Sequence, residues 1–141
     1  MKRSTEELLN ILKKSSDIAN FIDDNSEDLI NIIPLCNYLE NILIQKNLKK
    51  SEVIRLSGLD RKYCYEIFAG TKSPSMDKVL ALCLAANLSD SETMHLLKST
   101  GYPQLYARIE RDSVILFALQ HHLSLTDVNE LLYEMGFPCL E

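Results

Sequence analysis

Four hydrogen-bonding side chains, Arg61, Lys62, Tyr65 and Glu66, crowd one short stretch of the chain. Residues three or four apart share one side of a helix, so a helix here would project all four together. A guanidinium can bind a base edge or a phosphate through two parallel hydrogen bonds, and an ammonium can bind a phosphate as a point charge. The pattern therefore favours recognition of base edges and a phosphate backbone.

The surrounding sequence predicts two short helices that would hold these side chains. One pattern begins at Ser51, a residue type preferred as an N-cap, and ends at Leu56. Gly58 follows in a predicted turn, where a glycine accepts a positive φ at little steric cost. A second helix is predicted from Arg61 to Ala69, with Asp60 as its N-cap.

The second predicted helix has an apolar back. Cys64, Ile67 and Phe68 fall at i, i+3 and i+4, opposite the polar side chains. A short helix with an apolar back and a basic, aromatic front fits the major groove of duplex DNA. We expect Gly58 and Phe68 to have structural roles, with Phe68 buried.

The stretch from Lys50 to Gly70 resembles the helix-turn-helix of phage-repressor-like (Xre-type) transcriptional regulators. The resemblance covers about residues 35–88 and includes a downstream helix rich in leucine. Ile54 departs from it, standing where the family usually has alanine, and Ser57 stands where an apolar residue is common. The positions that carry the match are Val53, Gly58, Leu59, Cys64, Ile67, Phe68, Gly70 and the loop Lys72-Ser73-Pro74-Ser75.

The resemblance implies a lambda-repressor-like helical bundle that binds duplex DNA sequence-specifically, as a homodimer, to regulate transcription. Arg61 and Lys62 would reach base edges or adjacent phosphates, while Tyr65 and Glu66 would add base or sugar contacts. The complete predicted set is Lys49, Lys50, Arg55, Arg61, Lys62, Tyr65, Glu66 and Lys72.

Charge is distributed unevenly along the 141 residues. Residues 45–80 carry eight basic and four acidic side chains, a balance of +4, whereas residues 1–44 sum to −4 and residues 81–141 to −5. The total of −5 argues against a nucleic-acid coat protein. The basic residues lie around the candidate DNA-reading segment, as an electrostatic footprint would.

The chain also contains an internal repeat. Residues 77–105 and 112–140 match at an offset of 35, with ten identical positions. Each copy reads as a helix, a Leu-Ser corner, a second helix and a Gly-aromatic-Pro-x-Leu ending. No stretch alternates with period two, so we predict an all-α fold: an N-terminal helical segment (1–33), the DNA-binding bundle (34–105) and a C-terminal helical hairpin (106–141). We interpret the acidic residues 23–28 as a surface loop or linker.

Other chemistries find little support. The four cysteines form no CxxC pair and read as buried apolar residues, and His121 and His122 are adjacent, so they would point about 100° apart on a helix. No phosphate-binding loop or nucleophile motif is present. We therefore predict no enzymatic activity, no cofactor and no metal. No signal peptide or membrane-spanning run is apparent, so we expect a cytoplasmic protein.

A second interpretation is a non-enzymatic adaptor or antitoxin-like subunit that keeps the fold but binds a protein partner. The acidic flanks favour it, since together they outweigh the central basic charge. The sequence leaves open whether the N-terminal segment or the C-terminal hairpin forms the dimer contact.

Overall fold

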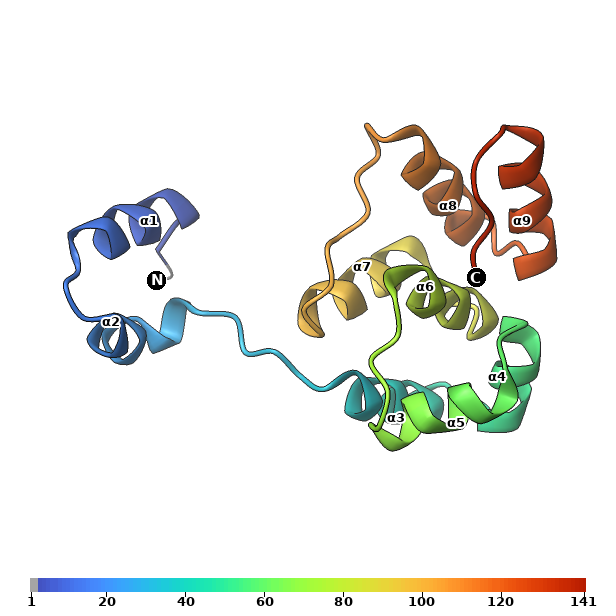
Figure 1. Ribbon diagram of the computed structural model, residues 1–141, viewed down its shortest axis with the longest axis horizontal. Coiled ribbons are helices and arrows are strands. Elements are labelled where there is room, and N and C mark those ends of the chain that lie inside the picture. Colours follow the sequence, from blue (N-terminus) through green and yellow to red (C-terminus); the bar gives the residue numbers. More distant parts are fainter. Residues whose placement is uncertain (1–2) are drawn as a thin grey trace. The chain divides into compact units, whose positions relative to one another are not determined.

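The computed structural model describes residues 3–141, and the regular structure in that range is entirely helical, which confirms the predicted all-α class (Figure 1). One 3₁₀ helix, η1, spans Ser26–Asp28. The α-helices are α1 (Thr5–Lys14), α2 (Ile18–Asp24), α3 (Leu35–Gln45), α4 (Lys50–Ser57), α5 (Arg61–Ala69), α6 (Met76–Ala85), α7 (Asp90–Ser99), α8 (Glu110–Gln120) and α9 (Leu125–Glu134).

The chain divides into two compact units, one ending at Asn31 and one comprising Ile32–Glu141. In the first unit, the side chain of Ser4 caps α1 and the carboxylate of Asp17 caps α2. The predicted loop at residues 23–28 is wrong, because α2 extends to Asp24 and η1 follows. The buried side chain of Asn25 joins them, donating to the carbonyl of Phe21 at 2.8 Å.

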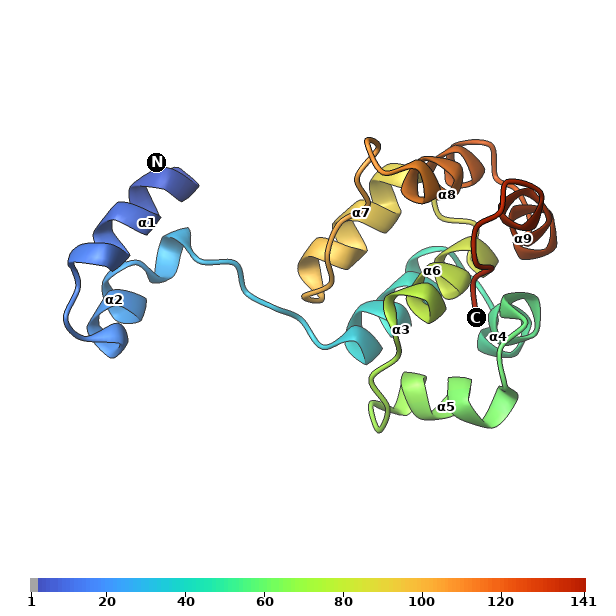
Figure 2. The same ribbon diagram turned by 45° about the horizontal axis from the view of Figure 1, so that its top comes forward.

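The second unit contains α3 to α9 around one continuous apolar core. Helix α4 packs on α6, α3 packs on α5, and α8 packs on α9. Figure 2 shows α6 in the middle of this unit, with the other helices arranged around it. All seven helices contribute buried side chains to this core. The segments on either side of the boundary predicted at residue 105 therefore share one core.

The repeated hairpins have the same corner. Asn87 and His122, which correspond in the repeat, both have positive φ, at 58° and 53°. The N–H of the next residue, Leu88 or Leu123, then donates to a carbonyl five residues back, at 3.1 and 3.0 Å. The two corners also touch, since His122 Nδ1 lies 3.0 Å from Asn87 Oδ1.

The same corner occurs a third time, between α3 and α4, and this copy was not predicted from the sequence. Asn47 has a φ of 53°, and the N–H of Leu48 donates to the carbonyl of Leu43 at 2.9 Å. The second unit therefore contains one corner geometry three times, with α5 inserted between the first and the second copy. Of the three helix pairs that these corners join, α8 and α9 pack most closely on each other.

An ion pair joins the two repeated hairpins. The Arg111 guanidinium donates to both carboxylate oxygens of Asp77, at 3.1 and 2.9 Å, and its Nε donates to the carbonyl of Pro138 at 3.1 Å. A bidentate contact of this kind fixes orientation as well as distance. It holds the start of α6, the start of α8 and the C-terminal segment together.

Burial predicts a strong difference in thiol reactivity. Cys64 and Cys83 are buried, and burial raises the pKa of both thiols, that of Cys83 to about 12. Because the thiolate is the nucleophile, we expect iodoacetamide at pH 8 to modify the half-buried Cys36 and Cys139 first in the native protein. Peptide mass spectrometry over time would measure this order, and equal rates at all four thiols would contradict it.

Candidate nucleic-acid interface

Helices α4 and α5 meet at a tight turn. Helix α5 has the predicted bounds, and the Asp60 carboxylate accepts from the N–H of Tyr63 at 2.9 Å. Gly58 ends α4 with a φ of 67°, as predicted. The predicted start of α4 is wrong, because the helix begins at Lys50 with Lys49 as the N-cap residue, and Ser51 lies inside it.

The departure from the family pattern at Ser57 is accommodated by hydrogen bonds. Its buried hydroxyl donates to the carbonyl of Ile54 at 2.6 Å and accepts from the N–H of Leu59 at 3.3 Å. A buried hydroxyl with partners avoids most of its desolvation cost. The second departure, the larger Ile54, is also fully accommodated in the core.

Helix α5 has one buried and one exposed side. Cys64, Ile67 and Phe68 are at most 5% exposed, which confirms the predicted apolar back and the burial of Phe68. Arg61, Lys62 and Tyr65 are exposed on the other side. Figures 1 and 2 both show α5 at the edge of the second unit, with its outer side uncovered by any other element of that unit. These three side chains are therefore sterically free to approach a duplex.

Arg61 and Tyr65 line a groove at the junction of α4 and α5, together with the carboxylate-bearing Glu52. The guanidinium carbon of Arg61 lies 5.8 Å from the centre of the Tyr65 ring, one helical turn away. The groove, of about 570 Å³, also includes Ser51 and Arg55 from α4 and Gly58 from the turn. The arrangement offers two guanidinium groups, from neighbouring helices, on one concave surface.

Carboxylates interrupt the basic surface around α5. The Nζ atom of Lys50 lies 2.5 Å from a carboxylate oxygen of Glu40 in α3, and Arg55 is 2.5 Å from Glu52. The Nζ atom of Lys72 lies 3.8 Å from the carboxylate of Glu66, the residue predicted to contact a base or sugar. Within residues 3–141, by contrast, no carboxylate forms an ion pair with Lys49, Arg61 or Lys62. The ion pairs of Lys50, Arg55 and Lys72 are at the surface. A phosphate can therefore replace the carboxylate in each pair at a cost of about 1 kcal/mol or less.

The C-terminal hairpin contacts the turn between α4 and α5, which the sequence analysis did not predict. A methyl carbon of Leu125, the first residue of α9, lies 3.1 Å from where a Cβ at Gly58 would be. The glycine therefore serves two purposes, because it adopts a positive φ and leaves room for Leu125. The contact connects the repeat to the turn that precedes α5.

We expect Gly58→Ala to destabilise the protein more than Gly136→Ala. Both glycines have positive φ, which costs alanine about 1 kcal/mol, but a Cβ at Gly136 would meet nothing within 4 Å. Urea unfolding of both variants isolates the contact with Leu125. In a Leu125→Ala background, Gly58→Ala and Gly136→Ala should lower the free energy of unfolding by similar amounts. If the two variants lose equal stability while Leu125 is still present, the contact with Leu125 does not restrict position 58.

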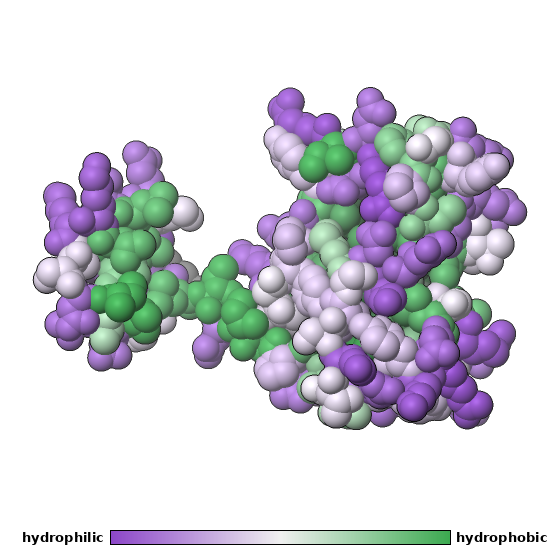
Figure 3. Space-filling model, in the orientation of Figure 1, coloured by the Kyte–Doolittle hydropathy of each residue, from purple (hydrophilic) through white to green (hydrophobic). Residues whose placement is uncertain are grey.

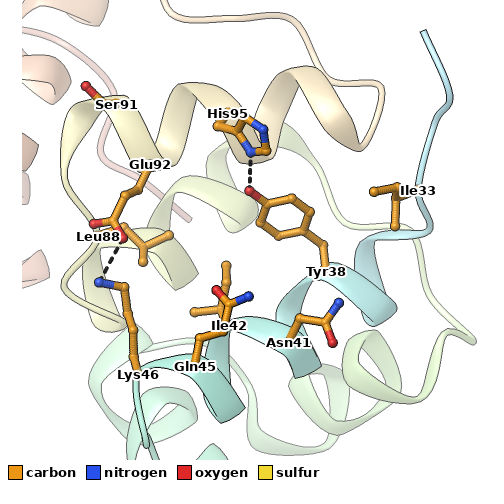
Figure 4. Close-up of a pocket in the computed structure, with 10 residues that line it drawn as sticks. All are labelled: Ile33, Tyr38, Asn41, Ile42, Gln45, Lys46, Leu88, Ser91, Glu92 and His95. Atoms are coloured by element: carbon orange, nitrogen blue, oxygen red, sulfur yellow. Dashed lines mark hydrogen bonds and ion pairs between the residues drawn. The ribbon is translucent and has the colours of Figure 1, made fainter.

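A separate pocket lies between α3 and α7 (Figure 4). It has a volume of about 480 Å³, and Ile42 and Leu88 contribute apolar surface to it. Two pairs of its polar side chains are in contact: Tyr38 Oη lies 2.5 Å from His95 Nδ1, and Lys46 Nζ lies 2.8 Å from Glu92. Asn41, Gln45 and Ser91 also line it. The hydrogen bond from Lys46 is the main cause that lowers the pKa of Glu92, and burial is the main cause that raises the pKa of Tyr38.

Across residues 3–141, no group of three His, Cys, Asp or Glu side chains is placed to hold a metal ion. Nor does any helix in that range have the length and apolarity required to cross a membrane. Comparison with protein-family models, curated proteins and solved structures found no match to this chain.

Proposed function

We propose that the protein is a transcriptional regulator that binds duplex DNA in a sequence-specific manner, with α5 in the major groove. The observation that carries the proposal is the exposure of Arg61, Lys62 and Tyr65 on one side of a helix whose other side is anchored in the core. Helix α4, the turn at Gly58 and α5 then act as a helix-turn-helix within a lambda-repressor-like bundle, in a cytoplasmic protein.

The contacts divide into two kinds. Arg61, at the start of α5, reads a base edge, because the N-terminal residues of a recognition helix reach deepest into the groove. Lys49 and Lys62 bind phosphates directly, whereas Lys50, Arg55 and Lys72 exchange their carboxylate partners for phosphates on binding. Glu66 holds Lys72 until that exchange takes place.

An adaptor without DNA binding is the second candidate, and the ion pairs of Lys50, Arg55 and Lys72 favour it. A surface whose cations are already neutralised attracts DNA less strongly than a free basic patch. In that case the exposed side of α5 would bind a protein partner, as in an antitoxin-like subunit.

The salt dependence of binding separates the two candidates. DNA binding predicts that the logarithm of the binding constant for a duplex falls linearly with the logarithm of the salt concentration, because bound phosphates release counterions. Lys72→Ala should reduce that slope by about 1 for every duplex sequence. Lys98→Ala, which removes an exposed lysine from α7, is the matched control and should leave the slope unchanged. Absence of duplex binding at low salt would favour the adaptor.

A further inference from the structure

The first unit leaves most of its apolar side chains uncovered. Among the described residues of this unit, Phe21 is the one buried apolar side chain, whereas Leu9 and Ile18 are each 60% exposed. Figure 3 shows hydrophobic residues gathered on the visible side of this unit. We define the N-terminal apolar surface as the exposed aliphatic residues of α1 and α2, namely Leu9, Leu12, Ile18 and Ile22.

A unit of this size requires something to cover that surface. It ends at Asn31, its two α-helices have 10 and 7 residues, and helices this short are marginal in water by themselves. Domains below about 40 residues usually depend on disulfides, metals or oligomerisation. The first cysteine is Cys36, outside the unit, and no metal-binding cluster exists within residues 3–141. Association is the remaining route.

The charges of α1 indicate which occupant fits. Glu6 and Glu7 lie in its first turn, and Lys13 and Lys14 lie in its last turn. All four are exposed, and none forms an ion pair within residues 3–141. Since successive residues of a helix are 100° apart, Glu6 and Lys13 border the side that carries Leu9 and Leu12, whereas Glu7 and Lys14 lie on the opposite side. A second α1 placed antiparallel would bring Glu6 of each helix beside Lys13 of the other, whereas a parallel copy would oppose like charges.

We propose that the N-terminal unit is a dimerisation surface on which α1 packs antiparallel against α1 of a second copy of this chain. Leu9 and Leu12 lie at the centre of the contact, and Glu6 and Lys13 flank it. Such a contact is isologous, so every pairing occurs twice and the assembly closes at two chains. The dimer does not require DNA, but it places two copies of α5 in one particle.

Charge reversal tests both the contact and its orientation. Sedimentation velocity of the full chain measures the dimer dissociation constant for the wild type, Glu6→Lys, Lys13→Glu and the double variant with both changes. Each single variant should weaken the dimer about five-fold, because two attractive pairs become repulsive. The double variant, and an equimolar mixture of the two single variants, should regain wild-type affinity. Lys98→Glu in α7 is the control for a charge change elsewhere.

Several outcomes would overturn the proposal. One is a wild-type chain that stays monomeric at high micromolar concentration. In that case the Leu9→Asp variant shows what covers the surface instead. A lower free energy of unfolding would indicate the second unit of the same chain, and an unchanged value would leave a different protein as the partner. A double variant that fails to regain the dimer contradicts the antiparallel contact. Monomeric single variants that still bind DNA leave the proposed function intact, and a stable dimer that binds no DNA leaves this inference intact.

Discussion

Phe68→Ala is expected to lower the free energy of unfolding by about 3–5 kcal/mol, the range typical of core aromatic truncations. Phe68 is 5% exposed on the inner side of α5 and belongs to the same core cluster as Val53 and Leu80. Its removal would leave a cavity between α5 and the helices behind it. The ring also lies 5.2 Å below the Nζ atom of Lys50, a smaller contribution that would be lost as well.

Urea denaturation followed by circular dichroism measures this loss. The matched control is Phe117→Ala, because Phe117 is 48% exposed on α8, with its ring tilted against that of His121, 4.2 Å away between ring centres. The control should cost about 1 kcal/mol or less, as surface changes do. Equal losses for the two variants would mean that α5 is rotated and that its polar side faces the core.

Arg61→Ala is expected to weaken binding to a preferred duplex by about 1–3 kcal/mol and to relax discrimination at one base pair. Arg61 is exposed at the start of α5, and within residues 3–141 no carboxylate pairs with it. Its guanidinium is therefore available for two parallel hydrogen bonds to a guanine. Fluorescence anisotropy with the preferred duplex and single-base variants of it measures both effects.

Lys72→Ala provides the contrast for this prediction. It should weaken binding to all duplexes by a similar factor, because a phosphate contact carries no direct sequence information. If Arg61→Ala also weakened every duplex equally, Arg61 would be a phosphate contact and base reading would have to come from Lys62 or Tyr65.

Local patterns were sufficient to predict most helices and the two sides of α5. The spacing of Cys64, Ile67 and Phe68 alone determines which side of a helix is apolar, and that side is buried. The start of α4 was missed because Ser51 was chosen for its capping chemistry. The corner at Asn47 instead starts the helix at Lys50, so corner geometry outweighed the preference of one side chain.

The third corner had a sequence signal that the offset of 35 did not detect. Residues 47–52 read NLKKSE and residues 87–92 read NLSDSE, with four identities at an offset of 40. The asparagine is informative, because it tolerates positive φ better than most residues. The longer offset arises because α5 is inserted between the first and the second corner.

Partners distant in sequence could not be predicted for the candidate site. The sequence indicated an exposed basic surface, but not that Glu40 in α3 would pair with Lys50 or that Glu66 would pair with Lys72. The contact between Leu125 and Gly58 joins residues 67 positions apart. Helical periodicity describes one element at a time, and such contacts depend on how elements pack together.

Selection from a pool of random duplex DNA tests the proposed function most directly. The full chain is incubated with the pool at low salt, bound duplexes are separated by gel shift, and enriched sequences are read after several rounds, with Arg61→Ala carried in parallel. We predict that the wild type enriches a defined motif and that Arg61→Ala loses preference at one position of it. A wild-type chain that enriches no motif would contradict DNA reading by α5.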